Sequence, residues 1–431
     1  MGGSTTSTTV PIVIDEIMTD RGTDGSDVRG DLTAAPSLAS VSTFPPTVCG
    51  IATYTAALLG ALAGHRRSAD RLTVVSLVDH ATGTGRSGAP DLPGPAPATA
   101  EHERGVGASF DRTTALLDDH DVVSIQHEFG IYGGPDGSEV TALLDAVSVP
   151  TLVTFHTVLQ EPTARQRAIV AHLARRSDRS IVMSRAAARR LATYYAVPPD
   201  RIQVIPHGFD ARLSGPSLAE GARPLALTWG LIGPGKGLEV AIEAFALLTD
   251  LDPLPRYRIT GATHPGVVAA SGETYRQQLE DLVAARCPEG MVEFDDRYLD
   301  LDSLHHQVRA ANLIVLPYLS TEQVTSGVLV EAIGAGKPVV STRFPHAVEV
   351  LASGAGIVVP QDDPVALAAA IRTVVSDPRA AGTMGQVARR VARDWTWPVV
   401  SARFDGLVRA VASGRTRGSR PRHTVRSGQR G

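Results

Sequence analysis

The feature that most constrains this chain is an alternation of short apolar runs with helical patterns, which occurs twice along the sequence. In the first repeat a helical stretch runs from Gly50 to about Ala63, and the apolar runs fall at 37–44, 71–78, 121–126, 150–155, 179–184 and 202–206. Short apolar runs that alternate with helices are typical of a parallel sheet covered by helices on both faces. We therefore predict a Rossmann-like α/β domain here, with the Gly- and Pro-rich stretch 83–100 as a loop.

The second repeat begins after a polar stretch at 209–224, which contains Pro and Gly and is predicted to be an interdomain linker. Helical patterns at 237–250 and 301–311 alternate here with apolar runs at 225–230, 257–261, 291–294, 313–318, 338–342 and 356–360. A chain of 431 residues is long enough for two ordinary domains. We predict an α/β fold of two Rossmann-like domains that face a cleft.

The domain boundaries follow from where the alternation starts and stops. We assign residues 32–215 to the first domain and 216–396 to the second. Residues 1–31 are rich in Ser, Thr, Gly and Asp without periodicity, so we predict a disordered arm. The helical stretch 397–412 has no strand after it, so we predict a separate C-terminal helix. One option is that this helix packs back on the first domain. The segment 413–431 carries six Arg and no acidic residue, and we predict a solvated, disordered basic tail.

Composition and charge exclude several classes of protein. A formal net charge of -4 gives no general attraction for nucleic acid. The two cysteines, Cys49 and Cys287, are far apart, so neither a disulfide framework nor a cysteine-rich metal site is indicated. The N-terminus lacks a basic start followed by an apolar core, and there is no run of 18 apolar residues. We expect a soluble cytoplasmic protein, with contact between the basic tail and the inner membrane face as an alternative.

Three histidines follow predicted strands of the first domain. His127, His156 and His207 each come at or just after the end of an apolar run, and Gln126 and Glu128 flank the first of them. Open parallel sheets bind ligands beyond the carboxyl ends of their strands, so three histidines there favour a ligand site. The structural alternative is that these histidines only bond to backbone groups at the strand ends.

A glycine-rich turn at the start of the second domain carries one of the two lysines in the chain. The sequence "WGLIGPGKGLE" at 229–239 fits the first part of a P-loop, with Gly235 and Lys236 in the expected places. A P-loop then needs Ser or Thr to hold magnesium, and this chain has Gly237. The turn is therefore predicted to be another device that brings a lysine and flexible backbone to a phosphate.

A second candidate site lies in "TEQVTSGVLVEAIGAGKPVVST", residues 321–342. Thr325, Ser326 and Gly327 precede an apolar helical run, so they are predicted to sit at a helix N-terminus. Free N–H groups and the helix dipole favour a phosphate at such a place. Glu331, one turn further in, is placed to accept hydrogen bonds from hydroxyls of a ribose or a sugar.

Two pairs of aspartates have the D-x-D spacing of some metal sites. They are Asp250 with Asp252 and Asp300 with Asp302, and both pairs lie at or near predicted helix ends. Aspartates at such positions commonly bond to nearby backbone groups. We predict that all four are solvated turn residues and that no metal is bound there.

The motifs taken together resemble those of retaining glycosyltransferases of the GT-B fold, in family 4. The specific part is the E-A-x-x-x-G-x-P-V-V pattern from Glu331 to Val340, with Glu349 beyond it, and the resemblance covers about residues 37–410. It implies a GT-B fold of two Rossmann-like domains with a cleft between them. It also implies a hexosyltransferase that uses a nucleoside-diphosphate sugar and a carbohydrate, lipid-linked or small-molecule acceptor, without metal or other cofactor.

The resemblance also implies roles for individual residues. His156 would lie beside the transferred sugar, Lys236 would neutralise the donor diphosphate, and Glu331 would hold the nucleotide ribose. These three are the catalytic candidates. The residues implied to bind the donor are Gly50, Gly235, Lys236, Gln323, Ser326, Gly327, Val328 and Glu331. The residues predicted on the acceptor side are His127, Glu128 and His207.

This chain departs from the family pattern at two positions. Gln323, with Glu322 beside it, stands where the family usually has a sugar-binding glutamate, and Leu231 stands where an arginine is usual. Lys236 is then the one strong cation predicted at the diphosphate. Two alternatives remain for the function: a sugar phosphorylase of the same fold, and a non-catalytic protein that binds nucleotide sugars.

Overall fold

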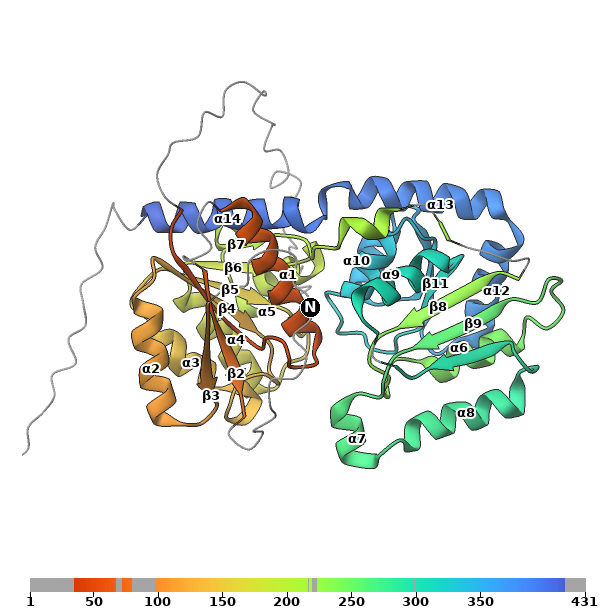
Figure 1. Ribbon diagram of the computed structural model, residues 1–431, viewed down its shortest axis with the longest axis horizontal. Coiled ribbons are helices and arrows are strands. Elements are labelled where there is room, and N and C mark those ends of the chain that lie inside the picture. The colour runs from red at the N-terminus through yellow and green to blue at the C-terminus, as the bar shows by residue number, and fades with distance from the viewer. Residues whose placement is uncertain are drawn as a thin grey trace, which may run out of the picture. The chain divides into compact units, whose positions relative to one another are not determined.

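Two parallel sheets organise the computed structural model of the chain (Figure 1). The structure describes residues 35–66, 72–79, 98–215, 217–218, 223–297 and 299–414. The predicted arm 1–31, most of the predicted loop 83–100 and all of the predicted tail beyond Gly414 lie outside the described residues. Within these ranges, every helix is too short or too polar to cross a membrane.

The first sheet contains seven strands in the order β3-β2-β1-β4-β5-β6-β7, and all neighbouring strands are parallel. Its elements along the chain are β1 (Leu38–Ser42), α1 (Gly50–His65), β2 (Leu72–Val78), β3 (Ala98–Glu103), α2 (Gly107–Asp118), β4 (Val122–His127), η3 (Pro135–Gly137), α3 (Glu139–Ala146), β5 (Thr151–Phe155), α4 (Ala164–Arg176), β6 (Arg179–Val182), α5 (Arg185–Tyr195), η4 (Pro199–Arg201) and β7 (Ile202–Val204).

The second sheet contains six strands in the order β10-β9-β8-β11-β12-β13, again with all neighbours parallel. A short 3-10 helix, η5 (Ala211–Ser214), lies in the predicted linker before it. The later elements are β8 (Leu225–Trp229), α6 (Leu238–Ala246), β9 (Arg256–Thr260), α7 (Pro265–Ser271), α8 (Thr274–Arg286), β10 (Val292–Asp295), α9 (Leu301–Ala310), β11 (Leu313–Leu316), α10 (Gly327–Gly334), β12 (Val339–Thr342), α11 (Pro345–Leu351), β13 (Gly356–Val359), α12 (Pro364–Ser376), α13 (Pro378–Val391), η6 (Ala392–Asp394) and α14 (Trp397–Gly414).

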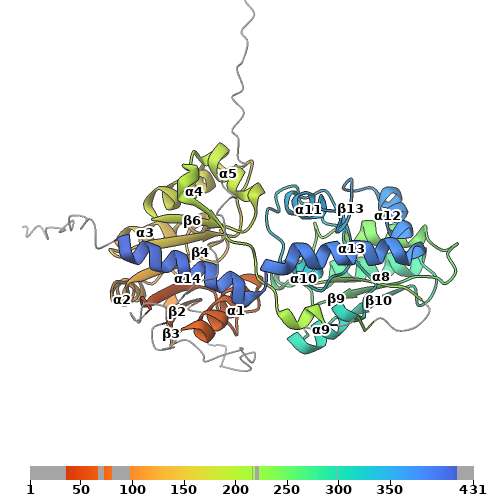
Figure 2. The same cartoon turned by 90° about the horizontal axis from the view of Figure 1, so that it is seen from above.

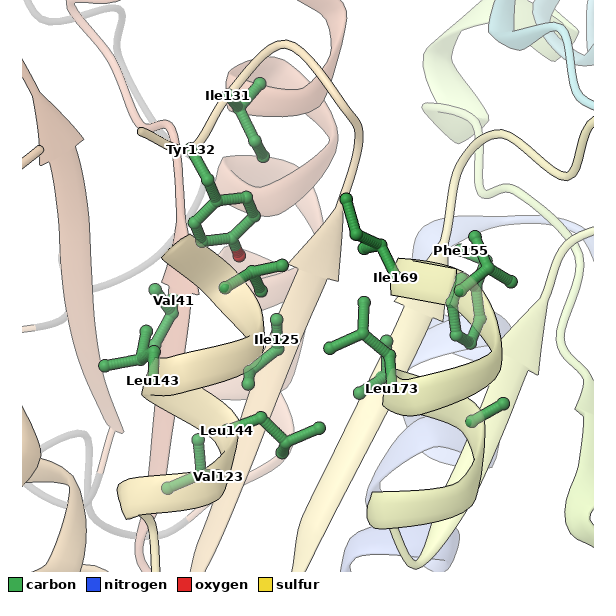
Figure 3. Close-up of a cluster of buried hydrophobic side chains, with 14 of the residues drawn as sticks. Val41, Val123, Ile125, Ile131, Tyr132, Leu143, Leu144, Phe155, Ile169 and Leu173 are labelled. Carbon is green, nitrogen blue, oxygen red and sulfur yellow. The ribbon is translucent and has the colours of Figure 1, made fainter. Parts of the chain in front are cut away.

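Most strands of the first sheet divide their side chains between two buried layers. Val41, Val123 and Ile125 belong to a core that includes Leu143 and Leu144 of α3, as Figure 3 shows. The residues of opposite parity, such as Leu38, Val122 and Leu152, belong to a second core with α1 and α14. Side chains alternate between the two faces of a strand, so apolar residues at both parities require helices on both faces. The second sheet has the same plan, with α6, α8 and α12 on one face and α9, α10 and α11 on the other.

Side-chain caps fix where several helices begin. Thr163 and Gln166 form a capping box at the start of α4, in which each side chain accepts from the other residue's backbone N–H. Asp300 accepts from Ser303 N at 2.8 Å at the start of α9, and Asp363 does the same for α12. Polar side chains at these points satisfy helix N–H groups that have no partner within the helix.

One strand was not predicted from the sequence. β3 includes residues 98–100, which we expected to be loop, and pairs with β2 from Thr73 to Val78. Its sequence, ATAEHE, has little apolar character because it is an edge strand and only one side of its backbone is paired. The two-sheet Rossmann-like architecture itself is confirmed.

The C-terminal helix α14 belongs to the first core, although it follows the second sheet in the chain (Figures 1 and 2). Its residues Val400, Phe404 and Val408 are buried against α1 and the first sheet. The helix extends to Gly414, two residues beyond the predicted end. Where the chain crosses back, Phe209 N donates to Trp395 O at 3.0 Å and Trp397 N donates to Phe209 O at 3.1 Å. The two crossings between the sheets are therefore bonded to each other.

Candidate functional site

Lys236 lies in the turn that follows β8, at the carboxyl end of the second sheet. Its ammonium nitrogen is 4.5 Å from the ring centre of Tyr318, which is fully buried. A small concavity beside it is lined by Thr228, Trp229, Gly230, Leu231, Ile232, Lys236, Leu238, Ile259, Thr260 and Tyr318. Burial lowers the pKa of Lys236. Leu231, which stands where the resembling family usually has arginine, also lines this concavity and places apolar surface near Lys236.

Glycines allow the backbone of this turn to adopt its path. Gly235 has φ +86° and Gly237 has φ +65°, both in the left-handed region. A Cβ on Gly237 would lie 1.9 Å from Pro317 O, so no other residue fits there. The position that would be Ser or Thr in a P-loop is thus reserved for glycine, and the P-loop interpretation is excluded on steric grounds.

Glu331 is the fifth of the eight residues of α10, and its carboxylate is directed at Trp229. The indole Nε1 of Trp229 donates to Glu331 Oε2 at 3.2 Å. Burial raises the pKa of Glu331 to about 7; the bond from Trp229 opposes this rise and the charge of Asp210 adds to it. A carboxyl group poised in this way can accept hydroxyl hydrogen bonds once it is ionised.

The N-terminus of α10 is capped on two sides. Ser326 Oγ accepts from Leu329 N at 3.2 Å, and Ser326 N donates to His346 Nδ1 at 3.0 Å. The amide of Ser326 is therefore already bonded, which corrects the expectation that it meets a phosphate. Among the described residues, the amides of Gly327 and Val328 have no acceptor, so these two remain available to an anion.

Glu322 and Gln323, which precede α10, have different surroundings. Glu322 Oε2 accepts from Arg190 Nη1 at 2.6 Å and from Gln160 N at 2.8 Å. Gln323 is half-buried, and its carbonyl accepts from His346 N at 3.4 Å. Glu322 is thus held by residues of the first domain, and the assignment of Gln323 to the sugar position stays a prediction.

His156 directly follows β5, as predicted, and is held on two sides. Its Nε2 lies 2.9 Å from Gln126 Oε1, and its ring meets the ring of Tyr54 edge-on at 4.9 Å between centres. Burial, with the neighbouring His207 and His127, lowers the pKa of His156 to about 3. The ring is therefore neutral at physiological pH.

His207 follows β7 and reaches the N-terminus of α10. Its Nδ1 donates to Gly208 O at 2.6 Å, because a carbonyl can only accept, so its Nε2 carries the lone pair. This Nε2 lies 3.0 Å from where a Cβ on Gly327 would be. Tyr54 and Trp397 contact the ring at 5.1 and 5.4 Å between centres. Burial lowers the pKa of His207 to about 4.

His127 and Glu128, both predicted on the acceptor side, have different degrees of burial. The His127 side chain is 1% exposed and packs against Phe129 and Phe155, so a ligand cannot reach it. Its place as the last residue of β4 turns the ring into the sheet's core. Glu128 accepts from Thr157 Oγ1 at 2.5 Å, and burial raises its pKa. The acceptor-side prediction is therefore wrong for His127, whereas the half-buried Glu128 and His207 stay candidates.

Several of the predicted residues, together with Tyr54, Trp229 and Tyr318, form one connected group, which we call the strand-end cluster. Lys236 lies on the ring of Tyr318, which neighbours Ser326. His207 Nε2 lies 3.0 Å from where a Cβ on Gly327 would be, and the ring of Tyr54 contacts the rings of both His207 and His156. Glu331 joins it through Trp229, which lines the concavity beside Lys236, and Val328 lies 3.9 Å from a Cβ on Gly230. Gly50, at the exposed start of α1, has open space around its Cβ position and stays apart.

Sequence reasoning missed four members of this region: Tyr54, Trp229, His346 and Trp397. Trp229 and Trp397 are two of only three tryptophans in the chain, and Trp229 ends a strand just before the glycine turn. That position was a usable signal for Trp229. His346 gave none, because its partner Ser326 is 20 residues away and is brought near only by the turn between β12 and α11.

The aspartate pairs sit at helix ends, as expected. Asp300 caps α9, and both carboxylate oxygens of Asp250 accept from Arg372, at 2.8 and 2.7 Å. Asp302 accepts from Arg212 at 2.7 Å. Within the part of the chain that the structure describes, no group of three or more His, Cys, Asp or Glu side chains could hold a metal ion.

Two family profiles match the chain, one in each half. The profile described as "Glycosyl transferases group 1" matches residues 212–391, and "Glycosyltransferase Family 4" matches residues 48–213. The two matches meet in η5, between the two sheets. Together they include every residue of the strand-end cluster.

Curated relatives match part of the chain. The D-inositol 3-phosphate glycosyltransferase of Corynebacterium glutamicum (strain R) is 30% identical over 233 residues, which are 50% of this chain and 53% of that relative. The protein of the same name from Corynebacterium efficiens is 29% identical over 248 residues, 54% of this chain and 56% of the relative. The chain thus spans little more than half the length of these relatives.

Solved structures match nearly the whole described fold. Sucrose-phosphate synthase from Thermosynechococcus elongatus is similar with a TM-score of 0.69 and 19% identity, over 88% of this chain and 100% of that one. Anabaena HepE in complex with UDP and glucose has a TM-score of 0.67 and 15% identity, over 87% and 100%. At such identities the likeness concerns the fold, and it confirms the predicted GT-B architecture.

Proposed function

Because the chain belongs to the group 1 glycosyltransferases, we propose that it moves a hexosyl group from a nucleoside-diphosphate sugar to an acceptor hydroxyl, with retention of anomeric configuration. The observation that carries this proposal is the strand-end cluster. It gathers a half-buried cation, free amides of a helix N-terminus and two neutral imidazoles beyond the carboxyl ends of the strands. These are the groups that a diphosphate and a sugar require.

The leaving diphosphate would be stabilised by Lys236 and by the amides of Gly327 and Val328. Negative charge grows on the diphosphate oxygen as the bond to the sugar breaks. Fixed donors aimed at that charge in a partly buried site are each worth roughly 2–4 kcal/mol of transition-state stabilisation. The resemblance implies transfer without a bound metal, so EDTA should leave turnover unchanged.

The nucleotide ribose would bind Glu331. The bond from the indole of Trp229 holds the carboxylate in place and leaves its other oxygen free to accept from hydroxyls. The solved relative in complex with UDP and glucose makes uridine donors the first to try.

The sugar would lie between Gln323 and His156. In a retaining transfer, the acceptor hydroxyl approaches on the face from which the diphosphate leaves, and a phosphate oxygen takes its proton. This route needs no pair of carboxylates at the spacing that glycosidases use. The acceptor would be a carbohydrate, a lipid-linked sugar or a small molecule that enters beside Glu128 and His207.

A thermal-shift screen of nucleoside diphosphates and their sugars tests the proposal. A ligand at a hundred times its dissociation constant adds about 2.7 kcal/mol of stability, which is readily measured. We expect one diphosphate, and its hexose derivative, to raise the unfolding midpoint, and purified protein to release that diphosphate from the sugar.

The same screen separates the two alternatives. A phosphorylase of this fold would bind inorganic phosphate and would have no use for a ribose site at Glu331. A non-catalytic binding protein would be stabilised by the donor but would never release the diphosphate. Stabilisation by phosphate alone, or binding without turnover even with acceptors present, would overturn the proposal.

A further inference from the structure

Gln126 contacts the imidazole of His156 from inside the first sheet. Its side chain is fully buried, next to the last residue of β4. Its Oε1 lies 2.9 Å from His156 Nε2, and its Nε2 lies 3.4 Å from the hydroxyl of Ser124. The amide nitrogen of Gln126 is thus directed toward Ser124 on its own strand, and the amide oxygen is directed toward His156.

This contact determines where the proton of the His156 ring sits. An amide oxygen can only accept, so Nε2 must carry the hydrogen and Nδ1 must carry the lone pair. The edge-on ring of Tyr54, 4.9 Å away between ring centres, packs against another side of the imidazole and limits its rotation.

We propose that Gln126 is a positioning residue, which holds His156 as the Nε2–H tautomer so that Nδ1 accepts a hydrogen bond from a hydroxyl of the donor sugar. The part of this proposal that concerns the sugar rests on the proposed function. The part that concerns the tautomer does not.

The groups around His156 leave its ring without a proton on Nδ1. The titratable side chains that face it are Tyr54 from α1, His127 from β4 and His207 from the segment after β7, and Glu128 is engaged by the hydroxyl of Thr157. Burial first, and then the two neighbouring histidines, place the pKa of His156 near 3. Between about pH 6 and 8 the ring is therefore a neutral acceptor through Nδ1.

Nitrogen NMR of the full-length protein, labelled with ¹⁵N-histidine and without ligand, tests the tautomer. We expect His156 in the parent to show a protonated Nε2 and an unprotonated Nδ1. Gln126→Met, which keeps the size and removes the amide, should give mixed tautomers. A protonated Nδ1 in the parent, or an unchanged tautomer in Gln126→Met, would overturn the proposal.

Turnover tests the link to the sugar, with UDP-glucose or whichever nucleotide sugar of the screen stabilises the parent most. Gln126→Met should lower kcat/KM by roughly tenfold, about the value of one hydrogen bond, while affinity for the bare nucleoside diphosphate stays within twofold. Normal kcat/KM with mixed tautomers would refute the role toward the sugar. If no nucleotide sugar binds the parent at all, the proposed function fails, and the NMR result still decides the tautomer.

The variant Gln126→Glu adds a signature that a structural role would not produce. A carboxylate beside Nε2–H raises the pKa of His156, and below that pKa Nδ1 gains a proton and stops accepting. At saturating nucleotide sugar, kcat of Gln126→Glu should therefore fall as pH drops from about 8 to 6, whereas kcat of the parent should stay flat in this range. Parallel pH profiles would count against the proposal.

Discussion

Lys236 and Lys337 are the two lysines of the chain, and their surroundings differ in what they offer an ammonium group. Lys337 Nζ donates to Arg309 O and Ala311 O, each at 2.7 Å, and to Ser217 Oγ at 3.2 Å. Lys236 Nζ has no acceptor among the described residues and lies only on the ring of Tyr318. One lysine is therefore consumed by the fold, and the other remains available to an anion.

This contrast gives a matched pair of variants. Lys236→Met should lower kcat, because the charge of Lys236 acts on the leaving diphosphate. The loss of transition-state stabilisation should be roughly 2–4 kcal/mol. The unfolding midpoint of this variant should stay near that of the parent. Lys337→Met should instead lower the unfolding midpoint, because the carbonyls of Arg309 and Ala311 lose their donor. Its activity per folded molecule should equal that of the parent. Steady-state kinetics with thermal denaturation of both variants checks this, and equal kinetic losses in the two would contradict it.

The carboxyl of Glu331 predicts how nucleotide affinity depends on pH. Its pKa is raised to about 7, and only the ionised form can accept from two ribose hydroxyls. As pH falls through 7 the carboxyl takes up a proton that nucleotide binding must release, so affinity should fall by up to about tenfold per pH unit. Calorimetric titration of UDP from pH 6 to 8 measures this slope. Glu331→Gln should bind more weakly at pH 8 and show a shallower slope than the parent, in which only the titration of the UDP phosphate remains. A slope equal to the parent's would assign the proton to another group.

At the scale of elements, helix α5 and the segment before α10 hold each other. Arg190, which is buried, donates to Val158 O as well as to Glu322, and Ser184 Oγ donates to Val324 O at 2.7 Å. At the start of α5, the amides of Arg185 and Ala186 donate to Glu349 of α11, at 2.9 and 2.8 Å. A carboxylate at a helix N-terminus is favoured by the dipole as well as by these bonds. The loop that carries Gln323 is thus positioned by the first domain.

A double-mutant cycle measures this connection. Arg190→Met should cost about 3 kcal/mol of unfolding free energy, because it leaves a partly buried carboxylate and several carbonyls without their donor. Adding Glu322→Gln to Arg190→Met should recover part of the lost unfolding free energy. As a control, Arg189→Met at the exposed neighbouring position should change the unfolding free energy little. Denaturant titrations give the four values, and strictly additive effects would mean that the pair is not coupled.

The sequence predicted the strand ends well and the contacts between them poorly. His156, Lys236 and Glu331 could be placed because strand periodicity and turn glycines are local signals. The bond from Trp229 to Glu331 joins residues 102 positions apart, and that from Arg190 to Glu322 joins residues 132 apart, which no local pattern encodes. β3 was missed for a related reason, since an edge strand does not need the apolar run that marks a buried one.

At the scale of the whole molecule, the C-terminal helix α14 packs into the hydrophobic core of the first domain. Helix α14 buries Phe404 at 1% exposure among residues of α1 and the first sheet. Its Asp405 accepts from the buried Arg66 at 2.6 Å, so the attachment has a polar part as well. The first domain therefore cannot reach its full stability until the last helix is present.

Phe404→Ala tests this dependence. Removing a fully buried aromatic side chain leaves a cavity and should cost about 3–5 kcal/mol of unfolding free energy. Arg403→Ala, at the neighbouring and largely exposed position, should change it by less than about 0.5 kcal/mol. Equilibrium unfolding in urea compares the two, and near-equal midpoints would mean that α14 is only loosely attached.

The paired crossings at Phe209 and Trp395–Trp397 limit how this protein can be recombined with its relatives. A single exchange near residue 213 would supply a foreign second half together with a foreign last helix, which would then face a core shaped for another sequence. A viable chimaera needs two exchange points, with 397–414 inherited along with the first half. Homologous genes that have traded halves should therefore show the ancestry of their N-terminal part again at the C-terminal helix.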